Sequence, residues 1–385
     1  MNNIEAAAYL VTDEGKSILG KINDCYHGKD DVLKIKEKFD MPAELFQAAL
    51  SIVEIRRKAV KKFANGEQMY FTRDGYEMAT SEEIANYRAL RFDQNDIVYD
   101  LCCGIGGDLL ALASHVKKVV AVDIDKINII YARENARIAG VSQKIEFVYG
   151  DVNDISIPDN SCVFIDPSRR SEKNAGKNPD KYSPPLSWVF DIAKNCKKIG
   201  IKVSPAIDFS SFSDFEIELI SYHGECKEAI LWGGELKKYE RVATVLPYLE
   251  SISSFQPESF AINDIGKFIY EPDSAIIRAG LVTNLAGKYN LSRIDDDIAY
   301  LTGETNVDSP LMKSYSVDTV LPWNLKNLNA FLREKNIGKV VIKKRGFPML
   351  PDEVEKKLKL TGGKHATIIL TRIKDNHFAI ICDIK

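Results

Sequence analysis

Four acidic side chains close four successive apolar runs in the middle of the chain. They are Asp100, Asp123, Asp151 and Asp166, each at or near the end of a run rich in Val, Ile, Leu or Phe. The carboxyl ends of parallel strands meet at one edge of a sheet, and open α/β sheets bind their ligands there. Carboxylates at that edge can accept hydrogen bonds from ribose hydroxyls and amino groups. The pattern therefore predicts a nucleotide-like ligand held by acids.

A glycine-rich turn lies between the first two of these acids. The sequence from Asp100 to Gly106 reads DLCCGIG, and it leads from an apolar strand pattern into an apolar helix pattern at residues 109–113. Glycine lets the backbone approach a ligand closely, because it has no Cβ. Asp123 lies 23 residues after Asp100, close to the spacing at which a carboxylate binds the ribose of a nucleotide. The segment predicts the first βαβ unit of a nucleotide-binding sheet.

The same segments resemble a known family. Residues 100–106 resemble the cofactor loop of class I S-adenosylmethionine-dependent methyltransferases, and residues 119–151 resemble the trimethylguanosine synthase group among them. Residues 79–85, which read ATSEEIA, are similar to the Thr-Pro-Glu segment of that group, with Ser81 where proline is usual. The resemblance implies an α/β fold with a Rossmann-like, doubly wound, seven-stranded class I methyltransferase core. It also implies S-adenosyl-L-methionine as the cofactor.

A second resemblance extends over the whole chain. Residues 164–170, 341–346 and 366–372 are similar to a bacterial group that joins a methyltransferase core to a carboxyl-terminal THUMP-like domain. This implies a helical cap at the amino terminus of the core and a small α+β region at the carboxyl terminus. We expect four domains: a helical domain over residues 1–68, the methyltransferase domain over 69–255, a small linker or ferredoxin-like domain over 256–306, and a basic THUMP-like α+β domain over 307–385.

The predicted cofactor site combines the acids with the glycine turn. We expect Asp100 and the backbone of residues 104–106 to bind the amino-acid part of S-adenosylmethionine. Asp123 is expected to accept from the ribose hydroxyls, and Asp151 from the adenine amino group. No metal is expected, because the sulfonium already activates the methyl group. The complete predicted set is Thr80, Asp100, Cys102, Gly104, Gly106, Asp123, Ile124, Asp151, Val152 and Asp166.

The acceptor side of the site is predicted from the residues after the fourth apolar run. Trimethylguanosine synthases carry Pro-Pro-Trp there, whereas this chain reads DPSRR from Asp166. We expect Asp166 to orient an acceptor amine, and we predict Asp166, Pro167 and Arg169 as the catalytic residues. Arg169 and Arg170 are candidates for contacts with RNA phosphates, and Tyr182 for stacking on a base.

Charge is distributed unevenly along the chain. The whole sequence carries a net charge of −3, yet residues 323–374 hold thirteen Lys and Arg against four Asp and Glu. A basic segment in an acidic chain is typical of a module that contacts a phosphate backbone. Lys343, Lys344 and Arg345 follow an apolar strand pattern, and we expect them to project together from its end as part of an RNA-binding surface.

The composition of the chain argues against several other classes of protein. The 385 residues, 45% of them hydrophobic, are enough for several domains with cores. No apolar run reaches eighteen residues, which predicts no membrane span, and the amino terminus lacks the pattern of a signal peptide. The seven cysteines include no Cys-x-x-Cys pair. That argues against disulfides and structural zinc and favours a reducing cytoplasm.

Three other functions compete with the prediction. A nicotinamide dehydrogenase needs Gly-x-Gly-x-x-Gly, but residue 109 is Leu. A C5-pyrimidine methyltransferase needs a nucleophilic cysteine near the fourth or fifth strand, where residues 166–168 and 203–205 contain none. A non-catalytic RNA-binding protein with this core has no need of all four acids. We therefore predict an S-adenosylmethionine-dependent methyltransferase acting on an exocyclic amine of an RNA base, guanine N2 first. A protein or small-molecule acceptor, or non-catalytic RNA binding, remains the alternative.

Overall fold

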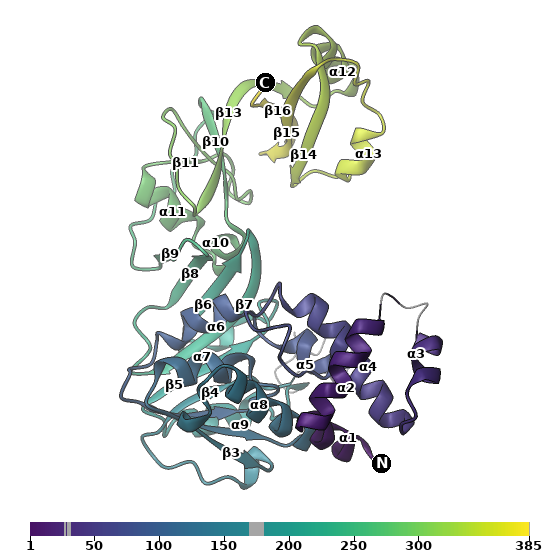
Figure 1. The fold of residues 1–385 in the computed structure, drawn as a ribbon. Coiled ribbons are helices and arrows are strands. Elements are labelled where there is room, and N and C mark those ends of the chain that lie inside the picture. The colour runs from purple at the N-terminus through teal and green to yellow at the C-terminus, as the bar shows by residue number, and fades with distance from the viewer. Residues whose placement is uncertain (27, 29–31, 169–180, 385) are drawn as a thin grey trace. The chain divides into compact units, whose positions relative to one another are not determined.

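The chain divides into two compact units that are described separately. The computed structural model describes residues 1–26, 28, 32–168 and 181–384. The first unit comprises Met1–Glu216 with Ala229–Lys238, and the second comprises Ile217–Glu228 with Tyr239–Lys385. Figure 1 labels the helices and strands in chain order. The predicted cofactor residues all belong to the first unit, and the basic segment belongs to the second.

The first unit begins with a cap of short helices. Asn2 and Thr12 accept backbone N–H groups as N-caps of the first two helices, as short polar side chains do at helix starts. The helices are interrupted before Pro42: one helix ends at Lys38 and the next begins at Ala43, because proline disfavours helix in the residue before it. The helices before the sheet are α1 (Asn3–Leu10), α2 (Asp13–Cys25), α3 (Val32–Lys38), α4 (Ala43–Ala59), α5 (Arg73–Met78) and α6 (Glu82–Ala89).

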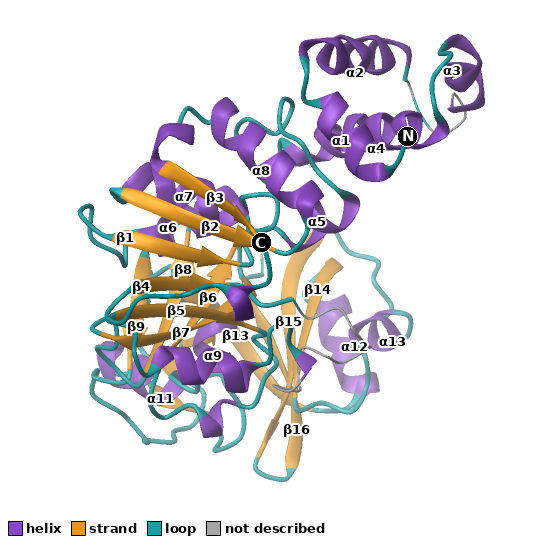
Figure 2. Ribbon diagram, turned by 90° about the horizontal axis from the view of Figure 1, so that it is seen from below, coloured by secondary structure: helices purple, strands orange, loops and turns teal. Residues whose placement is uncertain are grey.

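The sheet that follows has the predicted doubly wound order. Its strands run in the order β3-β2-β1-β4-β5-β7-β6-β8-β9, and Figure 2 shows the strands side by side. Strands β1 to β5 pair in parallel, and β7 is antiparallel to β5. The predicted seven-stranded core is confirmed, and β8 and β9 extend it. The bounds are β1 (Ile97–Leu101), β2 (Lys118–Asp123), β3 (Ile145–Tyr149), β4 (Cys162–Ile165), β5 (Lys198–Val203), β6 (Glu216–Tyr222), β7 (Glu225–Gly234), β8 (Arg241–Leu246) and β9 (Glu250–Ser253), with helices α7 (Gly107–His115), α8 (Lys126–Ile138) and α9 (Leu186–Ala193).

The pairing register aligns the carboxyl ends of the parallel strands. Leu101, the last residue of β1, pairs with Val122 in β2 and with Ile165, the last residue of β4. Strands β1 and β4 are almost entirely buried, as parallel strands covered on both faces must be. The polar residues that follow these strands therefore emerge at one edge of the sheet.

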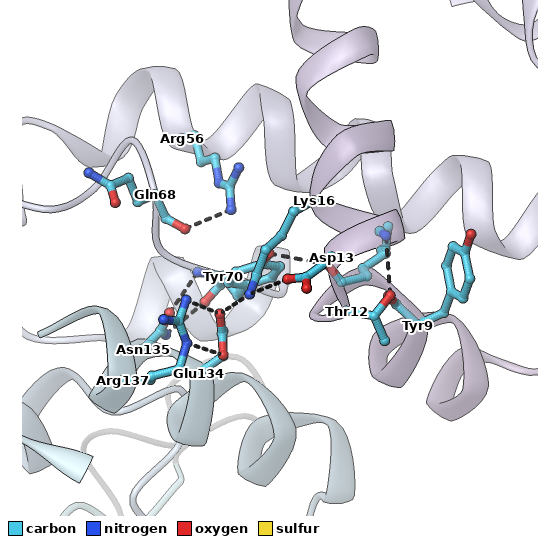
Figure 3. Close-up of polar contacts among 12 residues, drawn as sticks. Tyr9, Thr12, Asp13, Lys16, Arg56, Gln68, Tyr70, Glu134, Asn135 and Arg137 are labelled. Atoms are coloured by element: carbon cyan, nitrogen blue, oxygen red, sulfur yellow. Dashed lines mark hydrogen bonds and ion pairs between the residues drawn. The ribbon is translucent and has the colours of Figure 1, made fainter. Parts of the chain in front are cut away.

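Asn135 of α8 joins the helical cap to the glycine loop. Its side chain is fully buried. Its Oδ1 accepts from the backbone N–H of Tyr70 at 2.7 Å, and its Nδ2 donates to the carbonyls of Tyr70 and Ile105 at 3.0 and 2.9 Å. Beside it, Lys16 of α2 forms an ion pair of 3.0 Å with Glu134 (Figure 3). One side chain thus ties the cap to the loop after β1.

Replacing Asn135 with alanine is expected to lower the free energy of unfolding by about 2–4 kcal/mol, because three buried backbone groups lose their partner. Urea denaturation of the full chain measures the loss. Arg137→Ala is the matched control: the Arg137 side chain is 58% exposed in its ion pair with Glu134, so we expect its removal to cost less than about 1 kcal/mol. Equal losses in the two variants would contradict the role of Asn135.

The second unit, which includes β8 and β9, also contains a separate sheet of order β11-β12-β10-β13-β16-β15-β14. Adjacent residues of β15 face opposite sides: Ile368 packs in one hydrophobic cluster and Ile369 in another. Two helices, α10 and α11, are separated at Gly280, which adopts a left-handed φ of 72°. The bounds are β10 (Phe268–Pro272), α10 (Ser274–Ala279), α11 (Val282–Tyr289), β11 (Ser292–Arg293), β12 (Leu301–Gly303), β13 (Met312–Pro322), α12 (Leu325–Glu334), β14 (Ile337–Arg345), α13 (Pro351–Glu355), β15 (Lys364–Ile373) and β16 (Asn376–Cys382).

The predicted projection of the basic triplet from a strand end is wrong. Lys343, Lys344 and Arg345 are the last three residues of β14, and successive side chains of a strand point to opposite faces. Lys343 forms an ion pair of 2.6 Å with Glu271, and Lys344 donates to the carbonyl of Phe347 at 3.2 Å. Contact of the triplet with RNA stays a prediction.

No helix within the described part of the chain is long and apolar enough to cross a membrane.

Candidate active site at the carboxyl ends of the parallel strands

A pocket of about 550 Å³ opens where β1, β2, β3 and β4 end. Its volume is within the range of small-molecule and cofactor sites. All of its lining residues belong to the first unit. They are Thr72, Arg73, Asp74, Gly75, Met78, Ala79, Asp100, Cys102, Cys103, Gly104, Ile105, Gly107, Asp108, Asp123, Ile124, Asp125, Asn128, Asp151, Val152, Asn153, Asp166, Ser168, Ser183, Pro184 and Pro185.

The glycine loop leaves open space over the pocket. Gly104 has a φ of 56°, and a Cβ built on it would meet no atom within 4 Å. Its N–H donates to Asp123 Oδ2 at 2.7 Å, and the N–H of Cys103 donates to the carbonyl of Val122 at 2.9 Å. These bonds fix the loop to β2. Cys102 lines the pocket as predicted, while Gly106 lies outside its lining and serves as the N-cap of α7.

The two loop cysteines are poor nucleophiles. Burial raises the pKa of both Cys102 and Cys103 well above the usual value, and the neighbouring carboxylates, among them Asp100 and Asp123, add to the effect. Because the thiolate is the reactive form, these thiols stay protonated. Their surroundings therefore suit these two thiols to packing and not to nucleophilic attack.

Asp100 presents a buried carboxylate oxygen that lacks a hydrogen-bond partner among the described residues. The residue is 1% exposed and lines the pocket, and its Oδ2 is buried without a hydrogen bond. Burial raises the pKa of Asp100 well above its usual value, and Asp108, Asp166 and Asp123 raise it further by repulsion. An unpaired buried carboxylate is costly. The pocket is therefore suited to a ligand that brings a cationic N–H donor to this oxygen.

Asp123 is held in place by backbone and side-chain donors. Its Oδ1 accepts from the N–H of Asp125 at 2.8 Å and from Asn128 Nδ2 at 3.2 Å, and its Oδ2 accepts from Gly104. The residue is 6% exposed, and burial raises its pKa in spite of these bonds. Oδ2 keeps one acceptor position for a ligand hydroxyl. The next residue, Ile124, lines the pocket with a side chain 65% exposed.

Asp151 and Val152, which follow β3, also line the pocket. Asp151 Oδ1 accepts from the backbone and side-chain nitrogens of Asn153 at 2.9 and 2.6 Å, which fixes the carboxylate at the start of a short 3₁₀ turn. Val152 is buried and lines the pocket. Two apolar side chains, Ile124 and Val152, and one oriented carboxylate suit a flat heterocycle that carries an amino group.

Asp166 lies at the end of β4 and is paired with a buried lysine. Lys202 of β5, which is 3% exposed, donates through Nζ to Asp166 Oδ2 at 2.7 Å and to Thr80 Oγ1 at 2.9 Å. Asp166 lines the pocket, but Pro167 is buried outside its lining. Ser168 and Ser183, which flank the undescribed segment, exchange two backbone hydrogen bonds of 2.9 Å at the pocket.

The predicted contact of Thr80 with the cofactor is wrong. Thr80 is 2% exposed and outside the pocket lining. Its hydroxyl accepts from Arg88 Nη2 and Lys202 Nζ, both at 2.9 Å, and pairs with Asp108 Oδ2 at 3.1 Å. A hydroxyl has one donor and two acceptor positions, so this one is fully occupied by protein groups.

The predicted stacking of Tyr182 on a base is also wrong. The ring is 3% exposed, and its hydroxyl accepts from the backbone N–H of Ser204 at 3.0 Å. A ring enclosed in this way offers no free face to a nucleobase. Arg169 and Arg170, the other predicted acceptor-side residues, lie outside the described residues.

Sequence reasoning missed the contribution of α5. Thr72 caps this helix by accepting from the N–H of Gly75 at 2.9 Å, and both residues line the pocket together with Arg73 and Asp74. A Cβ on Gly75 would lie 2.6 Å from the side chain of Ile105, so glycine allows α5 to pack on the glycine loop. The Thr-x-x-Gly spacing was the available signal, because threonine is a common N-cap.

Family models match two parts of the chain. Residues 95–203 match the model described as RNA cap guanine-N2 methyltransferase, and residues 312–383 match the THUMP domain-like model. The first match covers the glycine loop and strands β1 to β5. The second lies within the second unit.

Comparisons with individual proteins also identify methyltransferases. An uncharacterized S-adenosylmethionine-dependent methyltransferase of Mycobacterium tuberculosis is 30% identical over 331 residues, which cover 83% of this chain and 90% of that one. An uncharacterized RNA methyltransferase of Gloeobacter violaceus is 28% identical over 41% of this chain and 30% of its own. The solved structure of a Porphyromonas gingivalis W83 protein assigned as a methyltransferase superposes with a TM-score of 0.76 at 18% identity, and covers 95% of this chain and 97% of that chain.

Proposed function

This chain belongs to the family of S-adenosylmethionine-dependent methyltransferases, and we propose that it methylates an exocyclic amine of an RNA base, with guanine N2 as the first candidate. The predictions of a methyltransferase and of S-adenosylmethionine as its cofactor are confirmed by the M. tuberculosis relative. The nature of the acceptor and the roles of the individual residues are our proposal.

The pocket supports a specific arrangement of the cofactor. The unpaired Oδ2 of Asp100 suits the ammonium of the amino-acid part, and the open space at Gly104 admits that part close to the backbone. Asp123 would hold the ribose, with Ile124 and Asp151 beside the adenine. The excess of carboxylates also complements the positive charge of a sulfonium ligand.

The reaction requires little from the protein beyond position and charge. Bound S-adenosylmethionine supplies a methyl group on positively charged sulfur. The amine nitrogen gives its electron pair to the new N–C bond, the C–S electrons stay on sulfur, and the amine then loses a proton. We assign Asp166 to accept a hydrogen bond from the acceptor N–H and then this proton. The pocket walls must hold the acceptor in line with the methyl group.

The observation that carries the RNA proposal is the match of residues 95–203 to the RNA cap guanine-N2 methyltransferase model. The similarity to the G. violaceus RNA methyltransferase and the THUMP domain-like match over residues 312–383 support it. The excess of Lys and Arg in residues 323–374 adds a physical reason, because positive side chains neutralise phosphates.

Transfer of tritiated methyl groups to RNA from cells lacking the protein tests the proposal. The wild-type chain is expected to label this RNA, and mass spectrometry of the nucleosides is expected to reveal a base methylated on an exocyclic nitrogen. RNA from cells that retain the protein is the control and should accept much less label. Label found only in a protein or small-molecule fraction would overturn the RNA assignment.

A second prediction concerns the basic region of the second unit. Lys356, Lys357 and Lys359 are exposed and close in sequence. If they contact phosphates, replacing all three with alanine is expected to flatten the dependence of log Kd on log salt by about two, since each lost contact removes about 0.7 with single-stranded RNA. Binding titrations between low and moderate salt measure the slope. The matched control replaces Lys118, Lys194 and Lys197 of the first unit. An unchanged slope in the first variant would contradict RNA contact by these lysines.

A further inference from the structure

A buried lysine beside the pocket has no assigned part in methyl transfer. Lys202 lies in β5, whose six residues are all buried, and is itself 3% exposed. Lysine is among the residues least often buried, because its charge loses hydration. Lys202 does not line the pocket. A cation would also repel a sulfonium ligand. The reason for its position must lie in the groups that it contacts.

Those groups form one network with Asp166 at its pocket end. Lys202 Nζ donates to Asp166 Oδ2 and to Thr80 Oγ1. Because Thr80 accepts from both Lys202 and Arg88, its hydroxyl proton must point to Asp108, which also forms an ion pair with Arg88. Two ion pairs, each with one nearly inaccessible cation, thus share one hydroxyl.

The network leaves one oxygen of Asp166 for another partner. Oδ2 is engaged by Lys202, while Oδ1 has no protein partner among the described residues. The side chain of Asp166 is 20% exposed and lines the pocket. A carboxylate held by one oxygen in this way has a restricted orientation. The bond from Lys202 to Oδ2 is charge-assisted, and such hydrogen bonds are strong enough to fix a side chain.

We propose that Lys202, fixed by Thr80, is a positioning residue that holds Asp166 through Oδ2 so that Oδ1 receives the N–H of the acceptor. The proposal deepens the proposed function and rests on it for the identity of the acceptor as an amine. It also explains why a lysine is buried in β5: the ammonium supplies the countercharge of a carboxylate that must remain an acceptor.

Lys202→Met tests the proposal in the full chain, with Lys202→Arg as the conservative variant. The methionine variant is expected to lower kcat for methyl transfer to RNA from cells lacking the protein by about 100-fold, while the Kd for S-adenosylhomocysteine, measured by calorimetry, changes less than about two-fold. Arginine keeps the positive charge, so the kcat of Lys202→Arg is expected to be about ten-fold higher than that of Lys202→Met. In an Asp166→Asn background, Lys202→Met is expected to cost less than two-fold more, because the two residues act as one unit.

Substitutions at Thr80 provide a second route if Lys202→Met fails to fold. Thr80→Ser keeps the hydroxyl and is expected to retain kcat within about three-fold, whereas Thr80→Val removes it and is expected to lower kcat by about ten-fold or more. Additive losses in the Lys202→Met, Asp166→Asn double variant, equal activities of the two Thr80 variants, or a large loss of S-adenosylhomocysteine affinity would each overturn the proposal.

A measurement without acceptor separates this proposal from the RNA assignment. The ¹⁵Nζ resonance of Lys202, assigned as the lysine signal missing from Lys202→Met, is expected to shift in Asp166→Asn and to stay unchanged in Asp154→Asn, which alters an exposed acid outside the pocket. If the wild-type chain labels no RNA but this resonance shifts as expected, the assignment of RNA as the acceptor is wrong, while the pairing of Lys202 with Asp166 is supported. If the resonance does not respond to Asp166→Asn, the positioning proposal fails whatever the acceptor.

Discussion

Replacing Asp166 with asparagine is expected to reduce methyl transfer by roughly 10²–10⁴-fold while the affinity for S-adenosylhomocysteine stays within about two-fold. Asparagine has nearly the shape of aspartate and keeps an oxygen acceptor, but it cannot take up the amine proton. Alanine is less informative, because it also removes the oxygen that accepts from Nζ of buried Lys202, and a buried donor left without its acceptor destabilises the fold. Initial rates with tritiated cofactor and calorimetry measure the two effects separately.

The matched control for Asp166 is Asp154→Asn. Asp154 is also an acid in the first unit, but it is exposed and outside the pocket lining, so activity is expected to change by less than two-fold. If Asp166→Asn kept near-normal turnover, Asp166 would be a structural acid. Loss of cofactor affinity in parallel with activity would instead place its main contact on the cofactor.

Replacing Asp123 with alanine is expected to weaken the binding of S-adenosylhomocysteine by roughly 100-fold, on the order of 3 kcal/mol. Two losses add here. The ribose loses a charged acceptor, and the glycine loop loses the bond from Gly104 N–H to Asp123 Oδ2. Calorimetry on the full chain gives the affinity directly.

Asp125→Ala is the informative comparison for Asp123. Asp125 is a neighbouring acid on the pocket, but its Oδ1 caps α8 by accepting from the N–H of Ile127 at 2.8 Å. Its loss is expected to cost stability of about 1 kcal/mol, as for other N-caps, with much less effect on affinity. The assignment of Asp123 to the ribose fails if its variant binds as tightly as wild type.

The elements of the pocket could be predicted because their signals are local. The apolar runs that end at or near Asp100, Asp123, Asp151 and Asp166, and the glycines between the first two, are features of contiguous sequence. They place four strands, one loop and the ligand edge without reference to distant residues. The parallel pairing then follows from the short right-handed connections between such strands.

Partners that come together only in the folded chain could not be predicted. Lys202 reads as one charged residue in an apolar strand, and nothing near it indicates that Asp166 and Thr80 surround its ammonium. Thr80 was expected at the cofactor because of its segment, but Lys202, 122 residues later, takes up its hydroxyl. Tyr182 was expected to stack on a base, whereas its ring is buried within the protein.

The prediction for the basic triplet was wrong for a different reason. Lys343, Lys344 and Arg345 were placed beyond a strand expected to end at Ile342, but β14 continues to Arg345. Strand ends are hard to locate from sequence, because long charged side chains are tolerated where a strand approaches the surface. The proposed division into four domains remains a prediction, and limited proteolysis would test its boundaries near residues 68, 255 and 306.

The tie through Asn135 makes the helical cap and the cofactor loop thermodynamically dependent on each other. Its amide bonds to Tyr70 on the cap side and to Ile105 within the loop. A ligand that orders the loop must also protect the cap from local opening. A change that loosens the cap must weaken ligand binding by the same factor, since such coupling is reciprocal. We therefore expect helices α1 and α2, which supply no pocket residue, to influence the affinity for the cofactor.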